Sequence, residues 1–340
     1  MNWKIKEKAE DFKVTELPNI DFNNDTKNEF LIFKLTKKNY SQTKSLRVIS
    51  GYFNIHRKEI GFSGIKDKYA ITEQYISIRK SKINNIDDEK LKIGFKKEFD
   101  SDLKIELIGS LDDNLYPGKL YGNNFEITIR NINKLSIEKF KDIEGTNIKI
   151  PNYFGEQRFG KNNFEVGLSI IKRDYKKAVK LIKNSGINKN ESMINRYYKG
   201  NNEIEVLKKF PKRFFKLYLH SVQSKIFNDI LASSINDKII YEKVYLGNFN
   251  IDERLPLVGH DTENDLALDI MEKYELMPFD FINKQITSAT LHEIMRNSFV
   301  ETKIEVTSYS LEENSLSFKF DLKKGSYATE AIEAIKGRVK

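Results

Sequence analysis

The order of strand-like and helix-like segments is the feature that most restricts how this 340-residue chain can fold. Strand-like segments occur in the first 130 residues of the chain and again near its C-terminus. Apolar and polar residues alternate, as in half-buried strands, at 13–16, 75–79, 103–108, 125–130, 303–309 and 316–322, and the more apolar segment 30–35 is typical of a more buried strand. Between them, apolar residues recur at helical spacing over 163–184 and 214–235. This order predicts an α+β fold in which a largely helical insertion interrupts one discontinuous domain.

Shorter signals add detail to this outline. Ser41 is suited to cap a helix over 41–53, because its hydroxyl can accept a hydrogen bond from the first turn. A polar turn at 312–315 joins the last two strands as a hairpin, and a final helix is expected over 328–335. A short strand is expected over 239–246.

The composition excludes several classes of chemistry. The chain has no cysteine, which rules out disulfides, a thiol nucleophile, cysteine-ligated zinc and iron–sulfur clusters. Its four histidines are His56, His220, His260 and His292, and their wide separation in the sequence argues against a metal site. His260 next to Asp261 could look catalytic, but we expect a structural role because no candidate nucleophile lies beside it.

No segment resembles a signal peptide or a membrane span. The first residues are charged throughout and lack an apolar core. No apolar run approaches the roughly 18 residues that a membrane-spanning helix needs. We therefore expect a soluble, cytoplasmic protein with no membrane partner.

The charge of the chain is uneven. The formal net charge is +9, which makes nucleic acid the first candidate among acidic partners. Residues 161–216 carry fifteen Lys and Arg against five Asp and Glu, whereas residues 252–280 carry nine acidic residues against two basic ones. The first segment is suited to bind a polyanion, and the alternative is that both segments are merely solvated helix surfaces.

The stretch 61–79 is the strongest candidate for chemistry. Gly61 and Gly64 form a tight loop that carries Asp67 between Lys66 and Lys68 and leads into a strand. Nearby cations keep a carboxylate ionised, which suits a nucleophile or an electrostatic stabiliser. The alternative is a solvated turn, since such residues are mostly exposed.

Two further stretches carry unusual combinations of residues. Phe125 follows a Gly-Asn loop, where it could stack on a flipped base while Asn123 hydrogen-bonds the polar edge of that base. Alternatively, Phe125 is a core aromatic and Asn123 a turn residue. Residues 151–160 combine three aromatics with Arg158, which suits stacking and phosphate contacts to RNA or a tightly packed domain junction.

These stretches together resemble the TruD family of tRNA pseudouridine synthases. The resemblance is most specific in 61–74 and 152–160. Further matches, in the same order as in the family, lie at 6–12, 122–125, 223–228 and 325–329. Residues 255–262 are closer to archaeal and eukaryotic members than to bacterial ones.

The resemblance implies a fold, an activity and a partner. It implies a pseudouridine-synthase catalytic domain formed by 1–148 and 298–340, with a mixed, mainly antiparallel sheet flanked by helices, and a TRUD insertion domain over 149–297. It also implies isomerisation of a tRNA uridine to pseudouridine, typically at position 13 in the D-arm, with no metal and no organic cofactor. tRNA is the implied partner, and no obligate protein partner is expected.

The resemblance also implies roles for individual residues. Asp67 matches the essential aspartate of the family, and Lys6 matches the basic residue that pairs with it. Phe125 matches the aromatic residue that stacks on the base. The expected substrate-binding residues are Lys6, Glu10, Lys66, Asn123, Phe125, Asn152, Phe154, Arg158 and Phe159.

The sequence departs from the family at Ala9, where proline is common, and at Tyr121, where a basic residue is common. Neither position is expected to touch the reacting groups, so these departures bear on the shape of the RNA contact.

Two other classes of function remain open at the level of sequence. A non-catalytic RNA-binding protein or RNA chaperone would share the basic segment but would not need Asp67 beside Lys6. A glycosylase or a methyltransferase would also act on a base, although the chain lacks the glycine fingerprint of a nucleotide-binding fold. Whether Asp67 attacks C1′, attacks C6 or removes the C2′ proton also remains open.

Overall fold

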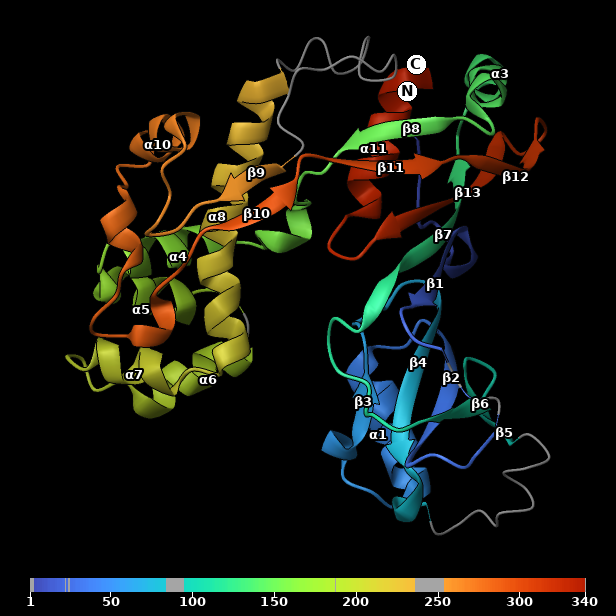
Figure 1. Cartoon of the computed structure of the whole chain (residues 1–340), viewed down its shortest axis with the longest axis horizontal. Helices are drawn as coiled ribbons and strands as arrows, with labels where there is room; N and C mark the ends of the chain where they lie inside the picture. The colour runs from blue at the N-terminus through green and yellow to red at the C-terminus, as the bar shows by residue number, and fades with distance from the viewer. Residues whose placement is uncertain are drawn as a thin grey trace. The chain divides into compact units, whose positions relative to one another are not determined.

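The computed structural model describes residues 3–339 apart from 22, 24, 84–94, 187 and 236–253. The strand expected over 239–246 lies outside the described residues. The chain divides into two compact units (Figure 1): the first contains residues 1–148, 301–328 and 339–340, and the second contains 149–300 and 329–338.

A nine-stranded sheet forms the centre of the first unit. Its strand order is β12-β13-β7-β1-β4-β2-β6-β5, with β3 paired to β4. β1 and β4 are parallel, and the other pairs are antiparallel, which confirms the predicted mixed, mainly antiparallel sheet. The strands are β1 (Phe12–Pro18), β2 (Phe30–Lys38), β3 (Ile60–Phe62), β4 (Ile71–Arg79), β5 (Lys96–Asp100), β6 (Leu103–Leu111), β7 (Leu120–Arg130), β12 (Glu305–Ser310) and β13 (Ser315–Lys323).

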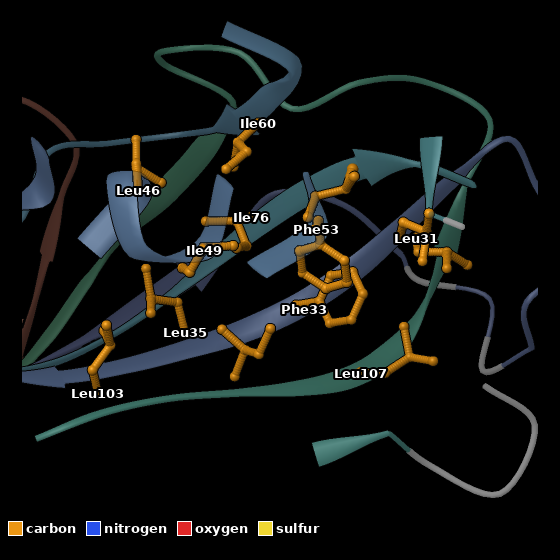
Figure 2. Packing of buried hydrophobic residues seen from close by; sticks show 13 residues of the cluster. Leu31, Phe33, Leu35, Leu46, Ile49, Phe53, Ile60, Ile76, Leu103 and Leu107 are labelled. Atoms are coloured by element: carbon orange, nitrogen blue, oxygen red, sulfur yellow. The ribbon is translucent and has the colours of Figure 1, made fainter. Parts of the chain in front are cut away.

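The helix α1 (Gln42–Phe53) packs on one face of this sheet. Its N-cap is Ser41, whose hydroxyl accepts a hydrogen bond from Lys44 N, which confirms the predicted helix start. Figure 2 shows Leu46, Ile49 and Phe53 of this helix directed at the apolar face of β2. The Phe33 and Phe53 rings lie 5.6 Å apart. The burial of Leu31, Phe33 and Leu35 fixes the register of β2, because a shift of the strand by one residue would turn these three side chains to the other face of the sheet.

The strand β7 begins earlier than the sequence predicts. The Gly-Asn segment before Phe125 was expected to be a loop, but Asn123 pairs with Glu16 of β1 and with Leu322 of β13. Gly122 permits this pairing, since a Cβ at that position would lie 2.1 Å from Leu322 O. The prediction of a turn here is therefore wrong, because cross-strand pairing on both sides outweighs the turn preference of asparagine.

The second unit is mostly helical. Its helices are α4 (Asn163–Ile171), α5 (Tyr175–Lys183), α6 (Asn188–Tyr197), α7 (Glu203–Lys209), α8 (Lys212–Ile235), α10 (Asp265–Glu272) and most of α11 (Ala328–Val339). A small antiparallel ribbon, β9 (Arg254–Leu257) with β10 (Ile294–Asn297), belongs to the same unit. The close crossing of α4 and α8 depends on Gly167, where a Cβ would lie 2.1 Å from Tyr218 O.

The single helix predicted over 163–184 is wrong, because the structure has two helices there. Arg173 adopts a left-handed conformation (φ 63°) between α4 and α5. The side chain of Asp174 then caps α5 by accepting a hydrogen bond of 3.0 Å from Lys177 N. An aspartate favours an N-cap over a helix interior, so it starts a second helix.

The remaining elements are short or connect the main ones. The helix α3 (Lys134–Ile143) belongs to the first unit, and β8 (Asn147–Pro151) pairs with β11 (Phe299–Lys303). The 3₁₀ helices are Ala9–Asp11, Arg57–Glu59, Lys80–Lys82, Glu156–Arg158, Pro278–Phe281 and Thr287–Ala289. Over the described parts of the chain, no helix is both long enough and apolar enough to cross a membrane.

Candidate active site

Asp67 and Lys6 meet at one edge of the large sheet. Asp67 lies in the loop between β3 and β4, and Lys6 lies in the segment before β1. Because β1 and β4 are parallel neighbours, the segments that precede them emerge at the same edge. Lys6 Nζ is 3.2 Å from Asp67 Oδ2, and both side chains remain partly exposed, at 25% and 35%. The pair is therefore accessible to a substrate.

The backbone of Lys6 is held in an unusual conformation. Its φ is +59°, a left-handed value that costs a non-glycine residue about 1–2 kcal/mol. The chain is fixed on both sides of it. Lys4 exchanges two backbone hydrogen bonds of 2.9 Å with Arg130 on β7, and the Asp11 carboxylate binds the Arg130 guanidinium, with Nη2 2.7 Å from Oδ1. Strain that the surrounding structure holds in place is typical of functional positions.

Asp11 is the anchor of this lead-in segment. Its side chain is almost completely buried, and it also accepts a hydrogen bond of 2.9 Å from Lys8 N. Burial alone would raise the pKa of Asp11, but its hydrogen bonds from Arg130 and Lys8 outweigh burial and hold the pKa below its usual value. The carboxylate therefore stays charged and keeps the segment in place.

A second lysine, Lys37, supports the Asp67 loop from inside the protein. It is completely buried, and its Nζ donates hydrogen bonds to Asp67 O at 2.6 Å and to Tyr40 O at 2.9 Å. Burial lowers the pKa of Lys37 to about 8, while the charge of Asp67 opposes this shift. Lys37 is not among the residues predicted from the sequence. The available signal was its position on the face of β2 that carries Phe33 and Leu35, because a lysine among core positions needs a partner.

The side chain of Lys66 is buried and contacts one residue on β1 and one on β7. Its Nζ lies 2.8 Å from Glu16 Oε2 on β1 and donates a hydrogen bond of 2.6 Å to Asn123 Oδ1 on β7. The side chains of Lys66 and Glu16 are only 4% and 1% exposed. Burial raises the pKa of Glu16 and lowers that of Lys66, although each charge opposes the shift of the other. Lys66 thus joins the Asp67 loop to Asn123.

Phe125 belongs to an aromatic cluster that the ammonium group of Lys6 contacts through Phe12. Its ring stacks on Phe320 at 5.5 Å and meets the ring of Phe12 edge-on at 6.0 Å. The Nζ of Lys6 lies 3.8 Å from the centre of the Phe12 ring. Phe125 itself is 7% exposed, so only a small part of its ring can meet a base in this conformation.

Glu10 lies in the 3₁₀ turn Ala9–Asp11, which comes directly before β1. It is exposed and pairs with Lys38 at 2.5 Å, and the hydrogen bond from Lys38 lowers the pKa of Glu10. Lys6, Glu10, Lys66, Asn123, Phe125 and Asp67 all belong to the first unit.

The other four candidates lie in the second unit. Asn152 and Phe154 are buried, at 6% and 8% exposure, and their partners are protein groups. Asn152 Oδ1 accepts a hydrogen bond of 2.7 Å from Arg296, whose guanidinium also lies 4.0 Å from the centre of the Phe154 ring. Arg158 and Phe159 are partly exposed, and Arg158 donates a hydrogen bond of 3.0 Å to Ser224 Oγ. In this stretch, Arg158 and Phe159 are therefore the candidates with surface available to RNA.

The basic segment is partly neutralised within its own unit. Lys172 pairs with Glu275 at 2.7 Å and Arg173 with Asp280 at 3.3 Å, so two of its cations bind the acidic segment. The helix α5 buries its apolar face and presents four lysines on its other face. These are Lys176, Lys177, Lys180 and Lys183.

A cavity of about 730 Å³ in the first unit borders the aromatic cluster of the site, because Phe320 both lines the cavity and stacks on Phe125. It is lined mainly by polar residues of β7, β11, β12 and β13, together with Phe320, and neither Asp67 nor Lys6 contributes to its wall.

The site geometry and the fold together describe a class of protein. A partly exposed carboxylate with a lysine partner lies at the edge of a mixed sheet, next to an aromatic cluster and to a buried Lys–Glu pair that holds an asparagine. Such a site suits an enzyme in which a carboxylate acts directly on a planar substrate held against aromatic side chains.

Comparison with known proteins identifies the family. Residues 1–191 match the model of the family "tRNA pseudouridine synthase D (TruD)", and this chain belongs to that family, whose enzymes isomerise tRNA uridine to pseudouridine. A Methanocaldococcus jannaschii protein named "Probable tRNA pseudouridine synthase D 2" is 28% identical over 97% of this chain and 90% of its own length. The Aquifex aeolicus tRNA pseudouridine synthase D is 35% identical over 53% of this chain and 46% of its own length.

A solved structure confirms the fold. The crystal structure of a Methanosarcina mazei protein described as a putative TruD superposes with a TM-score of 0.69 and covers 99% of this chain and 94% of that one, at 21% sequence identity. The family and the α+β fold expected from the sequence are therefore confirmed.

Proposed function

We propose that this chain isomerises a uridine of tRNA to pseudouridine, at position 13 of the D-arm, with Asp67 as the catalytic residue. Membership of the TruD family supports the reaction class. The observation that carries the assignment to this site is the partly exposed Asp67 carboxylate 3.2 Å from Lys6, whose backbone is held in a left-handed conformation. A non-catalytic RNA-binding protein would not need this strained pair.

The reaction sets clear demands on such a site. The uridine must leave the base stack, at a cost of a few kcal/mol, and enter a pocket. The N1–C1′ bond then breaks, the uracil turns over, and C5 bonds to C1′. C5 loses its proton and N1 gains one, so the product has the same mass as the substrate. We assign to Asp67 the attack on the nucleotide or the proton transfer that starts these steps.

The neighbouring residues have supporting roles in this proposal. The Lys6 ammonium donates a hydrogen bond to the Asp67 carboxylate and orients it, and Lys37 holds the Asp67 backbone carbonyl. Asn123 uses its oxygen to bind Lys66, so its amide N–H groups are suited to donate to a carbonyl oxygen of uracil. Phe125 stacks on the base, and Glu10 lies at the entrance.

We assign catalysis to one unit and binding of the tRNA backbone to the other. The first unit is the catalytic domain and the second is the insertion domain, whose α5 lysines bind tRNA phosphates together with Arg158. Neither a metal nor an organic cofactor takes part in the isomerisation. Because its substrate is tRNA, we place the activity in the cytoplasm.

One assay separates this function from its rivals. The purified chain is incubated with unmodified tRNA, pseudouridine is mapped by carbodiimide labelling, and free uracil is measured in the same reaction. We expect one labelled position in the D-arm and no free base. Release of uracil would instead establish a glycosylase, and tRNA that is bound but unchanged would establish a binding protein.

A further inference from the structure

We propose that His260, Asp261 and His292 form a binding site for a divalent transition-metal ion of the zinc or nickel type. The three residues offer ligand atoms that all lie within 4.8 Å of one another. They belong to the second unit and take no part in the isomerisation proposed above.

The spacing of the ligand atoms fits a metal ion. His292 Nδ1 lies 3.6 Å from Asp261 Oδ2. Two ligands bound to one tetrahedral zinc ion at about 2.0–2.2 Å are roughly 3.3–3.6 Å apart. The centre of the His260 ring lies 4.4 Å from the centre of the His292 ring, so the third ligand comes from a side chain in contact with the second.

The backbone already holds the two ligand-bearing segments together. They continue the β9–β10 ribbon, where Leu257 pairs with Ile294. A Cβ at Gly259 would lie 2.2 Å from His292 C, so glycine permits the closest approach of the two segments. Gln223, buried on α8, donates its amide to Val258 O at 2.7 Å and to His292 O at 3.2 Å. The backbone of the two segments that carry the ligands is therefore held together without a bound metal ion.

The aspartate is oriented in the way that metal ligands usually are. Asp261 Oδ1 accepts a hydrogen bond of 2.7 Å from Glu293 N, which leaves Oδ2 directed at His292. Such a second hydrogen bond fixes the ligand geometry in metal sites.

The donor set determines which ions fit. Two imidazoles and one carboxylate favour zinc, nickel, cobalt or copper, whereas magnesium prefers oxygen ligands alone. Asp261 and His292 are exposed, so water completes the coordination. An ion here would tie the segment 258–262 to the segment 291–293 and stabilise the second unit.

Titration of the metal-free full chain with ZnCl₂ in a calorimeter tests the proposal. We expect one zinc ion per chain, a rise in the midpoint of thermal unfolding, and no comparable effect of MgCl₂. His260→Ala, Asp261→Asn and His292→Ala should each weaken zinc binding at least about tenfold.

His56→Ala is the matched control, because His56 is also exposed but lies in the first unit, where it caps a 3₁₀ turn. This variant should bind zinc as the wild-type protein does. The visible absorption of the cobalt-loaded protein would report the coordination geometry independently of stability. Zinc binding that is unchanged in the three ligand variants, or no binding to the wild-type protein, would overturn the proposal.

Discussion

At the scale of single residues, Lys6 shows how the site uses strain. Its left-handed backbone is fixed by Arg130, which binds the chain on both sides of it. The conformation costs about 1–2 kcal/mol for a lysine but almost nothing for glycine. The protein therefore keeps an unfavourable residue where a charged side chain must reach Asp67.

A matched pair of variants tests this interpretation. Lys6→Gly and Lys6→Ala both remove the ammonium group, so both should lose activity. Lys6→Gly should nevertheless be more stable than Lys6→Ala by roughly 0.5–1 kcal/mol, because relief of strain exceeds the entropy cost of glycine. Urea unfolding measures the difference. Equal stability would show that the left-handed conformation is not retained in solution.

Lys37 makes the site sensitive to alkaline pH. Its pKa is lowered to about 8 from 10.5, chiefly by burial. The ammonium that holds the Asp67 loop is therefore present below about pH 8 and deprotonates above it. We expect kcat/KM of the wild-type protein to fall above about pH 8. A Lys37→Arg variant that folds should keep a flat profile to higher pH, because its guanidinium stays charged.

The same residue predicts a change in stability. The unfolded chain keeps the Lys37 proton up to its ordinary pKa of 10.5, so between pH 8 and 10.5 the unfolded state binds more protons than the folded one. Stability of the wild-type protein should therefore rise with pH over this window relative to Lys37→Arg. A pH profile that is the same in both proteins would contradict the assignment.

At the scale of elements, the buried Lys66–Glu16 pair joins the Asp67 loop to β1 and β7. Both side chains are almost fully buried, and Lys66 also binds Asn123. Removing one partner leaves a buried charge unpaired, which typically costs about 3–5 kcal/mol.

We expect Lys66→Met to lower the free energy of unfolding by about 3–5 kcal/mol. The double variant Lys66→Met/Glu16→Leu should recover most of this stability, since it leaves no unpaired charge. Its activity should stay low, because Asn123 would no longer be held. Chemical denaturation and the pseudouridine assay measure the two effects. A double variant with normal activity would show that the pair is only structural.

The elements also show which parts of the structure could be predicted from the sequence. Strand-like patterns predicted seven of the nine strands of the sheet, all except the short β3 and β5, and Ser41 predicted the start of α1, because these signals are local. The split between α4 and α5 at Arg173 and the strand character of Asn123 were missed, since both depend on interactions with distant parts of the chain. Asp67 is a candidate that its own loop suggests, whereas the contact of Lys37 with that loop and the contact of His260 with His292 depend on the register between distant segments.

At the scale of the whole molecule, the charge distribution predicts how tRNA binds. The four lysines of α5 are the part of the basic segment that we expect to meet phosphates. Affinity for tRNA should fall steeply as salt rises. Replacing all four with glutamine should reduce the slope of log K against log salt by about one unit for each phosphate that the variant no longer binds. Replacing them with arginine is the control and should keep the slope. A tRNA affinity insensitive to salt would contradict this account.

In the proposed reaction, Asp67 performs the chemistry and does not merely bind RNA. The most direct test is to measure pseudouridine formation and tRNA affinity in Asp67→Asn, with Lys68→Met, an exposed neighbour on the same loop, as the control. We predict that Asp67→Asn loses at least about 10³-fold in turnover while its affinity for tRNA stays within a few-fold of the wild-type value, and that Lys68→Met modifies tRNA normally. Turnover by Asp67→Asn at the wild-type rate would contradict the account.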